Sequence, residues 1–199
     1  MNKYIKALIL YILCVPLCPH LFIYYIYKIK HKELSCDLNH YKRRKNIKYN
    51  ETLCFVYLFI IFPEFRNIFY MRVGKIWRYV LFYLPPLSTL HIWTPSESIG
   101  GGLYIGHGWG TVINAEKIGK NCVIGQNCTI GSNKLKEPII EDNVSIWAHC
   151  IIIGNITVGK GANIGAGAVI VKDVPNNSVV VPAKSLIIKI DNKRVNIPL

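Results

Sequence analysis

Aliphatic residues recur at every sixth position through much of the second half of the chain. The series comprises Ile99, Ile105, Ile118, Ile124, Ile130, Ile140, Ile146, Ile152, Val158, Ile164 and Ile170. A glycine often follows the aliphatic residue, and the residue four positions after it is usually small or apolar. This period predicts short strands that stack in coils of about 18 residues, with one aliphatic side chain of each strand turned inward. We therefore expect a parallel β-helix over residues 94–190, with residues 191–199 as a C-terminal tail.

The six-residue period is broken at two places. Ten residues separate Ile130 from Ile140, which predicts a loop at Ser132–Pro138 that projects from the β-helix. Thirteen residues separate Ile105 from Ile118, one more than two repeats, and His107 lies in this stretch. Because departures from a regular pattern are often functional, both places are candidate parts of a site.

The first half of the chain begins with a long apolar segment. Residues 7–27 contain no charged side chain and have lysines on both flanks. A single helix of that length could just cross a bilayer core of about 30 Å, at about 1.5 Å per residue. Pro16 and Pro19 would kink such a helix in its middle. We expect a monotopic, bent or re-entrant helix; a full span and a helix buried under the second domain are the alternatives.

Further basic and apolar segments follow. Five basic side chains within His40–Lys48 suit anionic lipid headgroups, although a solvated loop is an alternative explanation. An apolar run, Leu53–Phe62, ends at a proline, and the apolar residues of Phe65–Leu84 recur at helical spacing. The latter segment predicts an amphipathic helix that lies in the membrane interface or packs on a partner. Residues 1–93 are therefore predicted to form a helical, membrane-associating region.

Composition narrows the class of protein. Hydrophobic residues make up 51% of the 199 residues and charged residues 18%, which excludes a disordered chain or a coiled coil as the main theme. The formal net charge is +13, and the apolar, aromatic half carries most of it, which favours a membrane surface. No nucleic-acid reading motif is recognisable, so nucleic acid is not an expected partner. Seven cysteines without a C-x-x-C pair predict neither a disulfide framework nor a zinc site.

The repeat resembles that of the hexapeptide-repeat acyltransferases from about Thr94 to Ile188. Residues 99–113, which include Gly106-His107-Gly108, are similar to the histidine-bearing segment of serine acetyltransferase, and residues 152–168 to its coenzyme A groove. The segment Pro63–Gly74 resembles a serine acetyltransferase-like subgroup found with polysaccharide biosynthesis. The resemblance implies a left-handed β-helix, a homotrimer and an acetyl-CoA-dependent O-acetyltransferase that uses no metal.

The resemblance also implies roles for individual residues. His107 would be the catalytic general base that takes the proton of the acceptor hydroxyl, and Asn114 or Glu116 are candidates for orienting it. The candidate coenzyme-binding residues are Gly131, Trp147, Ala148, Gly165, Ala166 and Lys184. The candidate acceptor-binding residues are Lys136, Glu137 and Trp109.

The chain departs from serine acetyltransferase where that enzyme holds its amino-acid acceptor. Ile92 and Gly106 stand in place of acidic residues, and Lys136 and Glu137 in place of an Arg-His pair. We also expect the soluble helical domain that precedes the β-helix in serine acetyltransferases to be absent, with the apolar, basic and aromatic segment in its place. We therefore expect the acceptor to be a sugar hydroxyl of a capsule, O-antigen or exopolysaccharide precursor at the cytoplasmic face of the inner membrane. Serine O-acetylation in cysteine biosynthesis is the alternative, followed by a non-catalytic scaffold and an antibiotic acetyltransferase.

Overall fold

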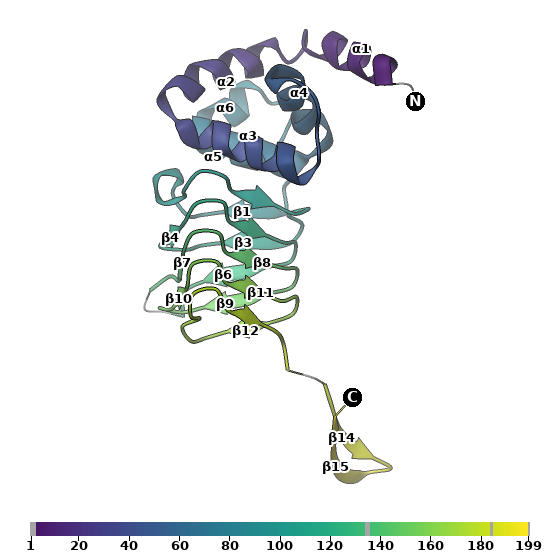
Figure 1. Cartoon of the computed structure of the whole chain (residues 1–199), viewed down its shortest axis with the longest axis vertical. Helices are drawn as coiled ribbons and strands as arrows, with labels where there is room; N and C mark the ends of the chain where they lie inside the picture. The colour runs from purple at the N-terminus through teal and green to yellow at the C-terminus, as the bar shows by residue number, and fades with distance from the viewer. Residues whose placement is uncertain (1–2, 134–135, 184, 199) are drawn as a thin grey trace.

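The computed structural model describes residues 3–133, 136–183 and 185–198. A layer of helices lies on one end of a column of short strands, and a two-stranded hairpin follows the column at the C-terminal end (Figure 1). The helices are α1 (Lys3–Leu13), α2 (Cys18–Lys30), α3 (Lys32–Arg44), α4 (Glu51–Ile61), α5 (Pro63–Val73) and α6 (Ile76–Val80), with a 3-10 turn, η1 (Ser96–Ser98). The prediction of a mainly parallel β-helix preceded by a helical region is confirmed.

Three parallel sheets wind around one core. Their strand orders are β1-β3-β6-β9-β12 in the first sheet, β4-β7-β10 in the second and β2-β5-β8-β11-β13 in the third. The strands of the first sheet are β1 (Leu90–Ile92), β3 (Thr111–Ile113), β6 (Thr129–Gly131), β9 (Ile151–Ile153) and β12 (Val169–Ile170). Those of the second are β4 (Lys117–Ile118), β7 (Ile139–Ile140) and β10 (Thr157–Val158). Those of the third are β2 (Tyr104–Ile105), β5 (Val123–Ile124), β8 (Ser145–Ile146), β11 (Asn163–Ile164) and β13 (Val179–Val180).

The repeated aliphatic residues form the core of the column. Ile105, Ile124, Ile146 and Ile164 pair in register from coil to coil along the third sheet, and all four are fully buried. The thiols of the buried repeat cysteines donate to backbone carbonyl groups in the same core; they are Cys122, Cys128 and Cys150. A single coil buries too little apolar surface to be stable alone, and the stacking of coils forms the continuous core.

The paired strands of the column begin at Leu90 and end at Val180. The hairpin of β14 (Leu186–Ile190) and β15 (Lys193–Pro198) follows and pairs antiparallel within itself. The division into residues 1–93, 94–190 and 191–199 stays a prediction.

Residues in the left-handed conformation turn many corners of the column. Asn121, Asn127, Asn143 and Asn177 all have φ between 54° and 59°. Asparagine enters this region more readily than most residues because its short polar side chain can bond locally. His107 and His149 have the same conformation, with φ of 67° and 61°. Asparagine is therefore a conformationally matched replacement for either histidine.

Prolines divide the first apolar segment of the helical region. α1 ends at Leu13 and α2 begins at Cys18, so residues 7–27 form two helices, with Pro19 in the first turn of α2. Within the described residues, no one helix has both the length and the apolar content needed to cross a bilayer. α4 and α5 have that length and apolar content only when taken together, and the chain bends by 114° between them.

The prediction of a single amphipathic helix over Phe65–Leu84 is wrong. α5 ends at Val73, the next residue is Gly74 with a φ of 102°, and α6 is a separate short helix. Glycine reaches this φ without the Cβ clash that other residues meet, which allows the chain to turn here. Phe65 and Phe69 are fully buried in contact with the other helices, so the apolar face of α5 is core.

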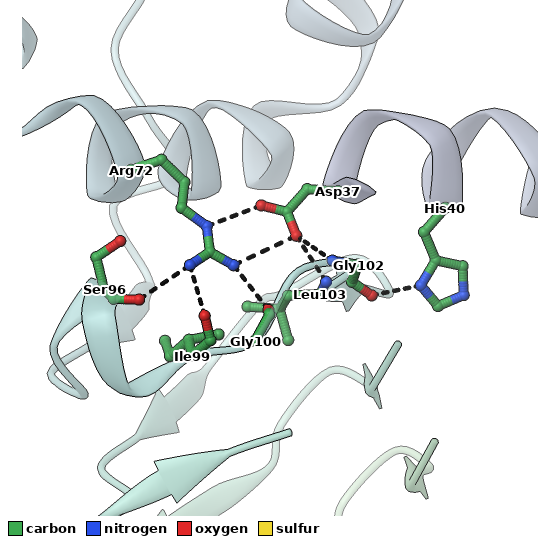
Figure 2. Close-up of polar contacts among 8 residues, drawn as sticks. All are labelled: Asp37, His40, Arg72, Ser96, Ile99, Gly100, Gly102 and Leu103. Atoms are coloured by element: carbon green, nitrogen blue, oxygen red, sulfur yellow. Dashed lines mark hydrogen bonds and ion pairs between the residues drawn. The ribbon is translucent and has the colours of Figure 1, made fainter. Parts of the chain in front are cut away.

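A buried ion pair joins the helices to the first coil (Figure 2). Nε of Arg72, on α5, donates to the Asp37 carboxylate, on α3, at 2.9 Å. The other donors of Arg72 reach the carbonyl groups of Ser96, Ile99 and Gly100. Asp37 also accepts hydrogen bonds from the backbone amides of Gly102 and Leu103, each at 2.7 Å. Two side chains from separate helices thus satisfy the exposed backbone at the open end of the column.

The basic run His40–Lys48 lies at the same junction. His40 is buried and bonds to the Gly102 carbonyl group. The Arg44 guanidinium lies 4.9 Å from the ring centre of Tyr104, and the Lys45 ammonium 4.7 Å from that of Phe62. At least these three residues of the run therefore contact the protein itself, and a lipid contact of the run stays a prediction.

Candidate functional site at a bulged corner

His107 lies at a corner, between β2 and β3, that contains two extra residues. Eight positions lead from Ile105 to Ile113, whereas six lead between their partners in the next coil, Ile124 and Ile130. Gly106 donates to the Ile124 carbonyl group and the Trp109 carbonyl group accepts from Asn127, which leaves His107 and Gly108 as the extra pair. They form a bulge that exposes the imidazole. The sequence shows only one extra residue because the next corner is one residue shorter.

Gly108 allows the helical region to approach this bulge. A Cβ atom at Gly108 would lie 3.1 Å from side-chain atoms of Ile105 and Leu90, and 3.2 Å from the Cβ of Glu64. Gly108 also has a positive φ of 70°. Only glycine meets both conditions without strain. The first turn of α5, which carries Glu64, therefore packs directly against the bulge.

Glu64 is an acidic residue of the site that sequence reasoning missed. The residue is 4% exposed, and burial raises the pKa of its carboxyl. Smaller contributions lower that pKa. They come from the residue's own backbone amide, the imidazole of His107, the ammonium of Lys45 and the backbone amide of His107. Glu64 stands 43 positions before His107, so its place in Pro63–Gly74 was the only available signal.

Two other histidines are structural. His20 is buried between the hydroxyl groups of Tyr70 and Tyr83, each 3.1 Å from a ring nitrogen. Burial lowers its pKa to about 4, with a smaller contribution from the charge of Arg66. His40 is buried at the junction described above. His107, in contrast, combines solvent exposure with an irregular corner, as expected of a residue that meets a substrate.

Four of the candidate coenzyme-binding residues share the corner of His107. Trp147 and Ala148 lie two coils below it, and Gly165 and Ala166 lie three coils below. The ring of Trp109 lies 5.9 Å from that of His107, centre to centre. Both Trp109 and Trp147 are exposed. The corner therefore presents the exposed Trp109 beside His107 and, two to three coils below, the exposed Trp147 with the small residues Ala148, Gly165 and Ala166.

The remaining candidates lie elsewhere. Asn114, Glu116, Gly131, Lys136 and Glu137 are at the corner where the first sheet passes to the second. There Nδ2 of Asn114 is 3.5 Å from the Glu137 carboxylate, and the Glu116 amide donates to the Pro138 carbonyl group. Strand β3 separates this corner from His107, so neither orienting candidate reaches His107 within the chain.

The last coenzyme candidate, Lys184, lies outside the described residues. In the part of the chain that the structure describes, no cluster of three or more His, Cys, Asp or Glu residues could hold a metal ion.

The repeats are similar in sequence to those of known transferases. Residues 137–172 match the model of the bacterial transferase hexapeptide family. The serine acetyltransferase of Bacillus pumilus is 39% identical over 107 residues, which cover 51% of this chain and 49% of that protein. This chain thus spans about half the length of the curated relatives it matches.

Solved structures of serine acetyltransferases are also similar to this chain. The Neisseria gonorrhoeae serine acetyltransferase in complex with serine is similar with a TM-score of 0.59 and 26% identity, over 81% of this chain and 71% of that one. The soybean serine acetyltransferase complexed with serine has a TM-score of 0.55 and 25% identity, over 77% of this chain and 67% of that one.

These findings correct two expectations. The predicted sugar acceptor is contradicted, because the relatives are serine acetyltransferases and two of the solved structures contain serine. The soluble helical domain that precedes the β-helix in serine acetyltransferases was expected to be absent. A likeness over 81% of the chain is larger than the share of the chain that lies after Leu90, so it includes part of the helical region of this chain. Residues 137–172 thus match the bacterial transferase hexapeptide model, and about half of the chain is similar in sequence to serine acetyltransferases.

Proposed function

We propose that the chain is an acetyl-CoA-dependent serine O-acetyltransferase. The observation that carries the proposal is the exposed His107 on a bulge, in the corner that also holds Trp147 and Gly165, in a chain with serine acetyltransferase homologues. Acetyl-CoA supplies an acetyl thioester. Neutral His107 takes the proton of the serine hydroxyl while that oxygen bonds to the thioester carbonyl carbon. The carbon–sulfur bond breaks, and the imidazolium returns the proton to the leaving sulfur.

The small residues of the His107 corner fit the arm of coenzyme A. A Cβ at Gly165 would lie 3.0 Å from the Val180 carbonyl oxygen, so a side chain at this position would crowd the backbone of the next coil. Ala148 and Ala166 add only methyl groups, and Trp147 adds an apolar ring. These residues would hold the pantetheine arm. Lys184 remains the candidate for its phosphates, because lysine is a common phosphate ligand.

Lys136 and Glu137 offer opposite charges to an amino acid. Their substitution for an Arg-His pair predicted the loss of the acceptor clamp, yet the lysine retains a cation for the serine carboxylate. The glutamate supplies an anion for the serine ammonium group. Serine recognition thus needs no residue type that the chain lacks. We assign Lys136, Glu137 and Trp109 to the acceptor site.

A homotrimer would bring the two corners together. His107 precedes the N-terminal end of a strand of the first sheet, and Gly131, Lys136 and Glu137 lie at the C-terminal ends of these strands or just after them. In a closed three-fold assembly, the loop of one protomer can face the His107 corner of the next. The outward aliphatic side chains of Ile151 and Val169, which are exposed on this sheet, would be covered by such packing. A left-handed winding of the coils is part of the same proposal.

The first experiment is thiol release from acetyl-CoA by the purified full chain. We expect release to depend on L-serine and to yield O-acetylserine, detected by mass spectrometry. L-Alanine is the matched control, because it has the same ammonium and carboxylate groups but no hydroxyl. Thiol release no faster with serine than with alanine would contradict the proposal.

We further propose that the helical region binds an anionic membrane surface, at the cytoplasmic face of the inner membrane. An apolar patch of exposed side chains covers α1, α2 and residues 76–82; it comprises Ile5, Leu8, Ile9, Tyr11, Ile12, Val15, Phe22, Ile26, Ile29, Ile76, Tyr79, Val80 and Phe82. The Tyr83 hydroxyl donates to the Pro16 carbonyl group, which joins these segments. Exposed Lys30, Lys75 and Arg78 adjoin the patch. Apolar side chains with adjacent cations are suited to a surface of anionic lipids.

Vesicle flotation tests the membrane proposal. The full chain is expected to float with phosphatidylglycerol-containing vesicles more than with phosphatidylcholine alone, and Phe22→Ser with Ile26→Ser to abolish flotation. Val179→Ser with Val181→Ser is the matched control, since it removes exposed aliphatic side chains from the β-helix. The proposal is wrong if the wild type does not float, or if the patch variant changes only the oligomeric size because a second copy covers the patch.

A further inference from the structure

The bulge that carries His107 rests on an acidic residue from outside the β-helix. Glu64 lies on the first turn of α5, and its Cβ would be only 3.2 Å from a Cβ at Gly108. The residue is 4% exposed, although a carboxylate is rarely buried without a partner. The α5 turn therefore supports the bulge, and the buried carboxyl group of Glu64 is influenced by the backbone amide of His107.

Several charged and titratable groups face this carboxyl group. His107 and Lys45 contribute positive charge near it. Arg66 on α5 and Tyr41 on α3 also sense its charge, which raises the pKa of each. For Arg66 and Tyr41, burial is the larger effect; it lowers the pKa of Arg66 and raises that of Tyr41. Glu64 is thus the acidic group of this cluster, and Lys45 and Arg66 are its neighbouring cations.

We propose that Glu64 is the positioning residue of His107, holding the bulge in place and stabilising the imidazolium that forms when His107 takes a proton. The proposal rests on serine O-acetylation as the function. A nearby carboxylate favours the charged imidazole, whereas Ile92 and Gly106, which replace acidic residues of serine acetyltransferases, cannot. The carboxylate partner of the base would then come from the helical region instead of the β-helix.

Kinetics of Glu64→Gln test this role. The glutamine keeps the size of the side chain and removes its charge. We expect kcat to fall about ten- to a hundredfold, as on loss of a supporting group, with the KM values for serine and acetyl-CoA nearly unchanged. Glu64→Asp should restore part of kcat, and Glu97→Gln, an exposed control, should behave as the wild type.

A chemical readout separates this proposal from the function itself. Diethyl pyrocarbonate acylates accessible imidazole groups, and peptide mapping resolves His107 from the other histidines. At one fixed pH, the rate constant of His107 modification should change in Glu64→Gln, whereas that of His149, a second exposed corner histidine, should stay the same. An unchanged rate constant at His107 would overturn the role of Glu64 even if serine is acetylated. A changed rate constant at His107 without serine turnover would retain the Glu64–His107 coupling and reject only the acceptor.

Discussion

Replacing His107 with asparagine is expected to lower kcat for serine acetylation about a thousandfold, the middle of the range for general-base catalysis. Asparagine removes the group that takes the hydroxyl proton. It keeps the corner conformation, because Asn121, Asn127 and Asn143 already adopt a similar φ in this β-helix. The rate is measured by thiol release from acetyl-CoA. Circular dichroism and size-exclusion chromatography should show an unchanged fold and oligomeric state.

His149→Asn is the matched control for this change. His149 has a φ of 61° at a corner without the bulge, so the same substitution has the same conformational cost there. We expect its kcat to remain close to that of the wild type. A His107→Asn enzyme that retains near-normal activity would remove His107 from the mechanism. Equal losses in both variants would instead indicate a general effect of changing the corners.

The β-helix could be predicted from the sequence because its physical cause is local and repeated. Each coil needs an inward aliphatic side chain at the same point, so Ile124, Ile146 and Ile164 show the period directly. The bulge was visible only in part, because two extra residues at His107 and one fewer at the next corner partly cancel in the spacing. Its two glycine-specific conditions at Gly108 become clear only with Leu90 and Glu64 in place.

The features that could not be predicted join distant segments. Nothing in the spacing links Glu64 to His107, or Asp37 to Arg72, because packing of the helices on the first coil brings them together. The acceptor was predicted wrongly for a different reason. Lys136 and Glu137 were assessed as replacements for an Arg-His pair, although together they still provide one cation and one anion for an amino acid.

The Asp37–Arg72 pair is the second place where a single change should have a large effect. Asp37→Ala is expected to lower the free energy of unfolding by about 3–5 kcal/mol, because it leaves the Arg72 guanidinium buried without its counter-ion. The amides of Gly102 and Leu103 also lose their acceptor. Chemical denaturation of the wild type and the variant measures the difference. The first coil should be the region where protection from amide hydrogen exchange is lost first.

Two comparisons decide whether this loss comes from the buried charge. Glu51→Gln breaks the half-exposed Lys28–Glu51 ion pair, which should lower the free energy of unfolding by less than about 1 kcal/mol. Asp37→Ala combined with Arg72→Met should be less unstable than the sum of the single variants, since no unpaired cation remains. Additive losses would mean that the two side chains stabilise the junction independently, through their separate bonds to the backbone of the first coil. Burial raises the pKa of the Asp37 carboxyl, and Arg72 only partly opposes this effect. Because the cost of removing both charges from water offsets much of their attraction, the pair chiefly determines the position of the helices on the β-helix.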